Sequence, residues 1–94
     1  MAKATWNGTT IATGTDTANV EGNTYFARSC LVEGMFRPSA TRTVCSWKGT
    51  AHYYDVVVGE AVNRDAAWYY PEPKAAAREV ADRIAFWKGV VVTP

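Results

Sequence analysis

The chain has 94 residues, enough for one domain with a modest core and too few for two. Hydrophobic residues make up 48% of the sequence and charged residues 20%, which is typical of globular proteins and excludes a disordered chain. Ten lysines and arginines against nine acidic residues give a net charge of +1. This balance excludes a strong electrostatic attraction to nucleic acid or to a membrane surface. We therefore expect residues 1–94 to form a single domain with neither partner.

The sequence predicts a cytoplasmic protein. No apolar run of signal-peptide length follows Met1, and no segment approaches the about 18 apolar residues of a membrane span. The two cysteines are Cys30 and Cys45. Because no export signal accompanies them, we interpret them as reduced thiols rather than as a disulfide.

The first strands are predicted from short alternating runs that turn residues separate. These runs are Thr9–Thr13, Ala18–Glu21 and Thr24–Ala27. The step from Gly22 to Asn23 suits a two-residue hairpin turn, because glycine readily takes the positive φ that such a turn needs. This turn would pair Val20 with Tyr25, and the three runs would form a meander.

The next segment lacks a regular period. Residues Arg28–Arg42 contain Gly34 and Pro38 and match neither a helix nor a strand. We therefore expect a long loop with a helical turn near Leu31–Met35, of the kind that is usually functional or mobile. A short strand over Thr43–Trp47 follows.

A long hairpin is the clearest feature of the second half. Residues Ala51–Tyr70 are rich in β-formers, and Gly59-Glu60 suits a tight turn in the middle of the run. The resulting register pairs Asp55 with Arg64, opposite charges that stabilise a strand pair by about 0.2–1 kcal/mol. Alternation leaves both faces of mixed polarity, so we expect the hairpin to form half of a groove.

A short helix and a last strand are predicted after Pro73. Ala77, Val80, Ala81 and Ile84 have the spacing of an amphipathic helix that lies on a sheet. The run Val90–Val92 indicates a closing strand. The fold class is therefore α+β and mostly β: an antiparallel meander and hairpins form a strongly bent sheet, with one short C-terminal helix.

Several stretches, in chain order, carry a resemblance to a known family. They are Gly8–Ala12, Glu21–Phe26, Thr43–Ala51, Ala66–Pro73 and Ile84–Phe86. The most specific parts are a Cys-x-x-Lys-Gly segment and a later Trp-x-Tyr-Pro segment. Together they resemble domain-of-unknown-function family 427, small bacterial and fungal proteins. The resemblance implies a compact β-rich domain, and the family is sometimes labelled nucleotidyltransferase-like.

The acidic residues themselves do not predict nucleotidyl transfer. That reaction needs carboxylates grouped to hold Mg²⁺ against phosphates. The closely spaced acids are Asp55 with Glu60 and Glu79 with Asp82, and neither pair lies in a glycine-rich phosphate loop. Zinc sites usually show paired Cys or His ligands at short spacing, which the chain lacks. We expect no metal and no cofactor.

Cys45, Lys48 and His52 lie close together around a turn. A neighbouring cation lowers the pKa of a thiol and makes it a better nucleophile. A small enzyme that uses Cys45 or Lys48 is therefore one hypothesis. The alternative is a purely structural role, in which Cys45 is a buried strand residue and Lys48 is solvated at the turn. Whether the protein is an enzyme therefore stays open.

The main functional hypothesis is a groove with aromatic walls and polar contacts. Folding of the long loop over the meander would bring both kinds of residue onto one concave surface. The aromatic candidates are Trp47, Tyr53, Trp68 and Tyr70, and the polar ones are Glu21, Asn23, Tyr25, Arg28, Arg42 and Lys48. Such walls are typical of small-ligand pockets, and arginine suits carboxylate or phosphate groups. We expect the protein to bind a small polar or anionic ligand.

The same aromatic residues also fit two further hypotheses. They could form an ordinary core with surface ion pairs around it. They could also form a protein-binding surface, in which case the protein would be a homodimer or an interaction module rather than a monomer that binds a small molecule.

Overall fold

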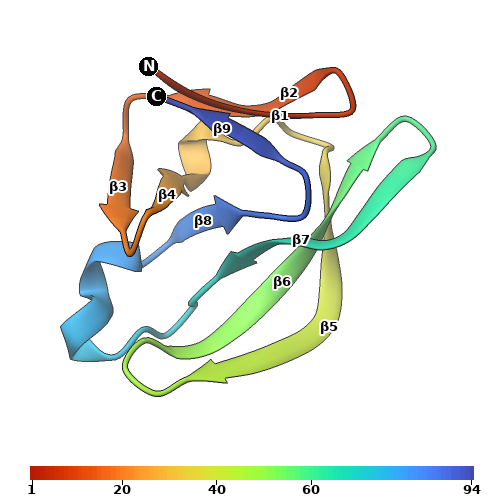
Figure 1. Cartoon of the computed structure of the whole chain (residues 1–94). Helices are drawn as coiled ribbons and strands as arrows, with labels where there is room; N and C mark the ends of the chain where they lie inside the picture. Colours follow the sequence, from red (N-terminus) through yellow and green to blue (C-terminus); the bar gives the residue numbers. More distant parts are fainter.

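The computed structural model describes residues 1–94 as nine strands in two antiparallel sheets, which confirms a mostly β fold. The smaller sheet has the order β2-β1-β9 and lies across the top of Figure 1. Its strands are β1 (Ala2–Trp6), β2 (Thr9–Gly14) and β9 (Val91–Thr93). The predicted closing strand at Val90–Val92 is thus confirmed as β9, paired with β1 of the same chain.

The larger sheet has six strands in the order β3-β4-β8-β7-β6-β5. Two short 3-10 helices accompany it, η1 (Arg28–Cys30) and η2 (Ala75–Val80). Its strands are β3 (Thr17–Val20), β4 (Asn23–Ala27), β5 (Phe36–Cys45), β6 (Gly49–Val58), β7 (Ala61–Tyr69) and β8 (Arg83–Phe86). In Figure 1 the long strands β5, β6 and β7 run between the upper right, where the β6–β7 turn lies, and the bottom of the molecule, where β5 turns into β6.

The predicted meander is wrong in its pairing. Strand β2 pairs with β1, which the sequence did not indicate, and not with β3. Strands β3 and β4 do form a hairpin, but its turn is Glu21-Gly22, with φ of 53° and 80°. A turn with positive φ at both central residues matches the twist of the flanking strands. Val20 therefore pairs with Asn23 rather than with Tyr25.

The predicted long loop is also wrong, because Phe36–Arg42 forms part of a strand and Arg28–Cys30 a 3-10 helix. The helical turn lies at η1, and β5 begins at Phe36 and continues to Cys45. A register irregularity between Pro38 and Arg42 interrupts its pairing with β6. Proline is tolerated there because β5 is an edge strand whose N–H groups need no partner on one side. This irregularity removes the alternation that would have indicated a strand.

The β6–β7 hairpin has the predicted turn at Gly59-Glu60, but the predicted pair of Asp55 with Arg64 is wrong. A bulge after Tyr54 shifts the register, and Asp65 takes a φ of 56° within it. The Asp55 carboxylate instead accepts the Asp65 N–H at 2.9 Å and forms a 3.2 Å ion pair with Arg37 of β5.

The bulge leads to a testable prediction of how the stability of the protein depends on acidic pH. The Asp65 carboxylate accepts hydrogen bonds from the hydroxyls of Ser39 and Thr41, which hold its pKa below the usual range. Its contribution to stability is therefore complete above the unfolded pKa of about 3.9 and is lost as pH falls through the lower folded value. We expect Asp65→Asn to cost about 1–2 kcal/mol at pH 7, because asparagine tolerates this φ and loses only the charged acceptor.

The measurement is urea unfolding of both proteins between pH 7 and pH 2. The difference in unfolding free energy should shrink below about pH 4. The matched control is Asp82→Asn, since Asp82 is exposed and has a similar φ of 58°. A difference that stays constant down to pH 2 contradicts the assigned role of the ionised carboxylate.

The predicted helix is shorter than expected and is not α-helical. The chain forms η2 with a kink at Ala77, where φ is −119°, and Ile84 belongs to β8. The reason is that β8 must insert between β4 and β7, so the chain turns back too early for a regular helix. Ala77 and Val80 are nevertheless buried, as their spacing predicted. No helix of the structure has the length and apolar character that a membrane crossing requires.

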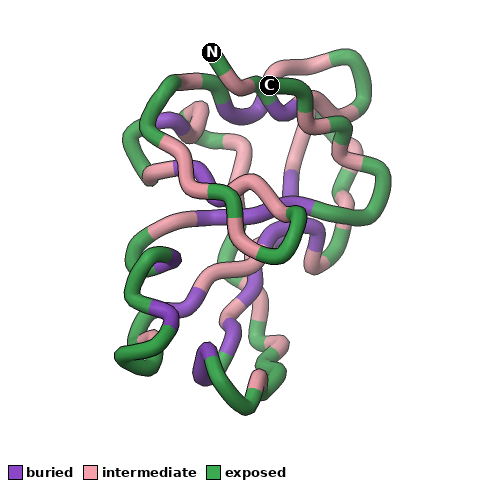
Figure 2. The backbone as a smooth tube through the Cα atoms, turned by 60° about the vertical axis from the view of Figure 1, so that its left-hand side comes forward, coloured by how far each residue is buried: buried purple, intermediate pink, exposed green.

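The structure has two hydrophobic clusters, one on each face of strands β4 and β8. Phe26, Ile84 and Phe86 belong to the cluster between the two sheets. Tyr25 and Ala85, their neighbours along the strands, belong to the cluster under η2. Figure 2 shows buried segments through the middle of the molecule and mostly exposed residues in the outer loops. The tyrosine-rich cluster under η2 carries the candidate site.

Candidate functional site

An open pocket of about 180 Å³ lies at the edge of the tyrosine-rich cluster. Its walls come from β4, the β5–β6 turn, β6, β7 and the segments that follow β7 and β8. The residues that line it are Asn23, Tyr25, Lys48, Tyr53, Trp68, Tyr70 and Trp87. The pocket thus combines five aromatic side chains with one cation and one amide.

Lys48 is the charged group of the pocket. Only 8% of its side chain is exposed, and its ammonium forms an ion pair with the Glu21 carboxylate. The ammonium also lies 4.7 Å from the ring centre of Trp47 and 6.0 Å from that of Tyr70. Burial alone lowers the pKa of Lys48, but the bond to Glu21 and the field of neighbouring groups outweigh it and raise the pKa above its usual value. This environment favours the charged ammonium form of Lys48.

The β5–β6 turn holds Lys48 in place. The Lys48 carbonyl accepts the backbone N–H of Lys74 at 2.8 Å, and the Lys74 ammonium donates to the Ser46 carbonyl at 2.8 Å. Gly49 follows with a φ of 117°, and a Cβ there would lie 3.2 Å from the Glu72 carbonyl oxygen. The turn and the Pro71–Lys74 segment therefore fit against each other only because position 49 is glycine.

The tyrosine hydroxyls supply further hydrogen-bond donors. The Tyr25 hydroxyl accepts the Trp68 indole N–H at 3.2 Å, so its own proton is available. The Tyr53 hydroxyl bonds with Thr43 at 2.8 Å. The Tyr70 hydroxyl makes no hydrogen bond within the chain, and burial raises the pKa of Tyr70 well above its usual value. Tyr70 therefore stays a neutral donor that is free to bind a ligand.

Cys45 packs against the same cluster from the end of β5 and is half-buried. Hydrogen bonding from the backbone N–H groups of Lys48 and Trp47 lowers the pKa of its thiol, and the Lys48 charge adds to this effect. Its surroundings are thus those of a reactive thiol rather than of an inert buried one. Cys30, in contrast, is buried in the other cluster.

We expect Cys45 to react with iodoacetamide at least about tenfold faster than Cys30 at pH 7.5, because it is more accessible and more ionised. The rate should reach half its maximum below pH about 8.5, the usual thiol pKa. Mass spectrometry of peptides after timed quenching measures both rates. In Lys48→Met the half-maximum should move to higher pH. Equal rates at the two cysteines would show that the turn does not activate the thiol.

The structure brings together most of the residues that the sequence singled out. Six of them line the pocket: Asn23, Tyr25, Lys48, Tyr53, Trp68 and Tyr70. Glu21 and Trp47 lie next to it and contact Lys48. Arg28 and Arg42 are not near the pocket and lie on the opposite face of β6 and β7, where Arg28 contacts Tyr54 and Arg42 pairs across the strands with His52.

Trp87 lines the pocket without having been predicted there. It follows β8, has 47% of its surface exposed, and lies edge-on to Trp68 with 5.8 Å between ring centres. Its indole N–H donates to the Asp65 carbonyl, which ties it to the bulge. The only signal in the sequence was a tryptophan at the end of a segment that matched both helix and strand.

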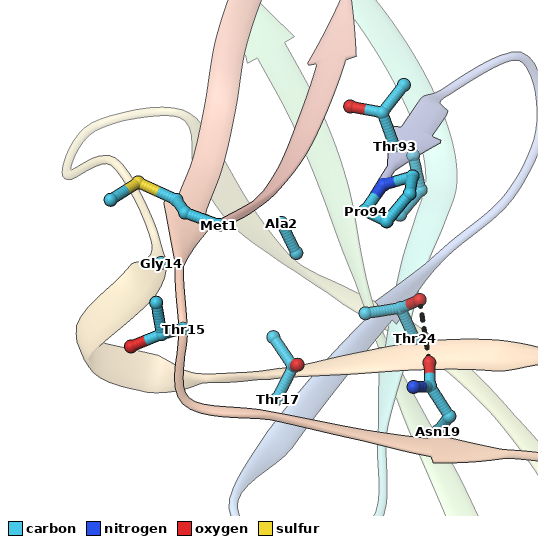
Figure 3. Close-up of a pocket in the computed structure, with 10 residues that line it drawn as sticks. Met1, Ala2, Gly14, Thr15, Thr17, Asn19, Thr24, Thr93 and Pro94 are labelled. Atoms are coloured by element: carbon cyan, nitrogen blue, oxygen red, sulfur yellow. Dashed lines mark hydrogen bonds between the residues drawn. The ribbon is translucent and has the colours of Figure 1, made fainter.

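A second hollow, of about 360 Å³, lies between the smaller sheet and strands β3 and β4 (Figure 3). Its lining includes Thr15, Thr17, Thr24 and Thr93, and Thr24 donates to the Asn19 side chain at 3.1 Å. No charged side chain or thiol lines this hollow. Its side chains therefore offer hydroxyl and amide groups but neither a charge nor a thiol, and the aromatic pocket is the stronger candidate site.

Comparison with known families and proteins identifies the family of the chain. No curated protein matches it. One family model, described as "Domain of unknown function (DUF427)", matches residues 1–93. The match spans both sheets and the whole aromatic pocket, in agreement with the resemblance seen in the sequence. The chain therefore belongs to the DUF427 family of domains of unknown function.

Proposed function

We propose that the aromatic pocket binds a small planar molecule that carries a carboxylate or a similar anionic group. The observation that carries this proposal is the buried Lys48 ammonium beside the unpaired hydroxyl of Tyr70. Both groups donate hydrogen bonds, and charged hydrogen bonds are about twice as strong as neutral ones. Trp68 and Trp87 provide the apolar surface for a ring.

The size of the pocket limits the ligand. A volume of about 180 Å³ lies below the range of about 300–1,000 Å³ that is usual for drug-sized ligands. A one-ring carboxylate suits this space, and a dinucleotide is too large for it. The ligand carboxylate would compete with Glu21 for Lys48, and 53% of the Glu21 side chain is already exposed to solvent. Displacement of Glu21 therefore returns it to water at little cost.

The surroundings of Cys45 favour a second candidate, a small enzyme that uses this thiol as a nucleophile on a ligand held in the pocket. Its lowered thiol pKa and its contact with the tyrosine cluster support this. The two free cysteines also support our proposal of a cytoplasmic, reducing location. A monomer is proposed for the binding function, since all pocket residues come from one chain.

The test is a titration followed by amide chemical shifts, with benzoate and its neutral counterpart benzamide as probes. We expect benzoate to shift the signals of Lys48, Trp68 and Tyr70, and to bind at least about tenfold more tightly than benzamide because of the ammonium. Tyr70→Phe should weaken benzoate binding about five- to tenfold. The control Arg42→Met removes a cation on the other face and should change nothing. Equal affinity for the two probes, or shifts outside the pocket only, contradicts the proposal.

A further inference from the structure

A second group of aromatic side chains lies on the face of β6 and β7 that points away from the pocket. Strand alternation places His52 and Tyr54 of β6 and Tyr69 of β7 on this face. The Tyr54 and Tyr69 rings are stacked, with 4.8 Å between centres and 21° between planes. The His52 ring lies 5.7 Å from that of Tyr69. These three side chains are half-buried, so the face is open to solvent.

Two arginines flank the rings. Arg28, from η1, donates from Nη1 to the Tyr54 hydroxyl at 2.9 Å, and its guanidinium lies 4.9 Å from the centre of the Tyr69 ring. Arg42, on β5, stands directly opposite His52, and its Nη1 donates to the carbonyls of Ser39 and Thr41 at 2.9 and 2.8 Å. Each guanidinium is thus held by one nitrogen and keeps its other N–H groups free.

Neither guanidinium has a carboxylate partner. The ion pairs of the chain join Arg37 to Asp55, Lys48 to Glu21 and Arg83 to Asp16. Both guanidinium charges nevertheless act on the same Tyr69 hydroxyl: burial raises the pKa of Tyr69, and Arg28 and Arg42 act in the opposite direction. Two positive charges therefore converge on one side of the stacked rings without a negative charge to balance them.

A hollow of about 540 Å³ continues this face past His52. It lies between the start of β6 and the Pro71–Lys74 segment. The residues that line it are Gly49, Thr50, His52, Pro71, Glu72 and Lys74. Glu72 is the only carboxylate among them, and the Lys74 ammonium is bound to the Ser46 carbonyl. The hollow is large enough for a ring compound with a sugar, whereas the aromatic pocket is not.

We propose that this second face binds a phosphate monoester of a planar ring, of which nucleoside monophosphates are examples. The planar, five-donor guanidinium matches phosphate oxygens in a two-pronged geometry, which lysine does not. Tyr54 and the Arg28 guanidinium already contact the Tyr69 ring, so the half-buried His52 ring offers the surface on which a ring can stack. A long single strand of nucleic acid is disfavoured, because only a few rings and two free arginines are present and the net charge is +1.

The experiment is an amide chemical-shift titration of the whole protein with four probes: AMP, adenosine, ribose 5-phosphate and inorganic phosphate. We expect AMP to shift His52, Tyr54 and Tyr69 and to bind at least about tenfold more tightly than each of the other three, since only AMP carries both ring and phosphate. Adenosine or inorganic phosphate that binds as tightly as AMP would overturn the proposal. So would an eight-residue oligothymidylate that binds more than a hundredfold more tightly than AMP.

Variants separate this face from the aromatic pocket. Arg28→Met and Arg42→Met should each weaken AMP binding about 10- to 150-fold, which corresponds to the loss of one charged hydrogen bond. Arg28→Lys keeps the charge but loses the planar fork, and should recover only part of the affinity. Arg78 is an exposed residue of η2, so Arg78→Met is the control and should bind AMP like the wild type.

Benzoate binding serves as the second readout in each variant. It should be unchanged in Arg28→Met and Arg42→Met, which also shows that these variants are folded. Loss of benzoate binding together with AMP binding would indicate one shared site and would overturn the assignment of two faces. Unchanged AMP affinity in both arginine variants would also overturn the assignment, because it would show that neither arginine contacts the ligand.

Discussion

Lys48→Met is expected to remove benzoate binding almost completely while leaving the protein nearly as stable as the wild type. The ammonium is the only charged donor in the pocket, and a charged hydrogen bond contributes about 1.5–3 kcal/mol, or about 10- to 150-fold in affinity. Methionine loses the ammonium contacts with the rings of Trp47 and Tyr70 but keeps a flexible chain of similar length, whose sulfur interacts favourably with aromatic rings. Removal of the ammonium leaves Glu21 in solvent, where an unpaired carboxylate costs little.

Replacement of Glu21, the other partner of the ion pair, should lower the stability of the protein and leave benzoate binding intact. Glu21→Gln leaves the Lys48 ammonium buried without its counter-charge. Loss of one partner of a fully buried pair costs about 3–5 kcal/mol, and because Glu21 is half-exposed we expect about 1–2 kcal/mol here. Benzoate binding should survive or improve, since the competing carboxylate is gone. Urea unfolding and benzoate titration of both variants test this pair of results. A Lys48→Met protein that loses more stability than Glu21→Gln contradicts the asymmetry.

The ion pair between Lys48 and Glu21 should contribute to stability only up to a strongly alkaline pH. The pKa of Lys48 is raised in the folded protein, so its contribution to stability is complete below the usual lysine value of about 10.4 and is lost as pH rises through the folded value. The difference between wild type and Lys48→Met should therefore be constant across neutral pH and change only in strong alkali.

Gly14→Ala is the substitution from which we expect a large loss of stability without any effect on either binding site. A Cβ at position 14 would meet the Cys30 sulfur far inside van der Waals contact. Cys30 is buried, and its thiol donates a 3.8 Å hydrogen bond to the Asp16 carbonyl, so it cannot simply rotate away. Overpacking of this kind costs about 1–3 kcal/mol, and we expect the upper end of that range.

A double-mutant cycle isolates the cause. Cys30→Ala alone should cost about 1 kcal/mol, and in that background Gly14→Ala should be nearly neutral, because the sulfur atom is gone. The coupling free energy between the two positions should thus be about 1–3 kcal/mol. Thermal and urea unfolding of the four proteins provide the values. Additive effects would mean that the strain at position 14 comes from the backbone and not from Cys30.

The aromatic pocket was largely predictable, because its residues depend on local patterns. Tyr53 faces Trp68 across the strands, and the alternation on β7 places Tyr70 on the side of Trp68. A hairpin with a recognisable turn fixes such relations within a few residues. The predicted pairing holds only near the turn, from Val56 with Asn63 to Val58 with Ala61, and the bulge at Asp65 shifts every pair beyond it by two residues. Because the shift is even, the pocket side chains keep their predicted face although their predicted partners change.

The position of Arg28 and Arg42 was not predictable in the same way. It depends on β5, whose pairing with β6 places Arg42 opposite His52 and sends its side chain away from the pocket. The irregularity near Pro38 hid this strand, and the residues around it resembled a loop. Strand β1 was missed for a different reason: its residues pair with β2 across a short turn and with β9 at the far end of the sequence, and nothing local indicates the second partner.

The pairing of β1 with β9 has a consequence for the speed of folding. Residues Lys3, Ala4 and Thr5 align with Thr93, Val92 and Val91, so this contact closes a loop of nearly the whole chain. The β5–β6 and β6–β7 hairpins close short loops and carry a much smaller entropic cost. The smaller sheet should therefore be completed after the rate-limiting step, and a change such as Val92→Ala should speed unfolding while leaving the refolding rate almost unaltered.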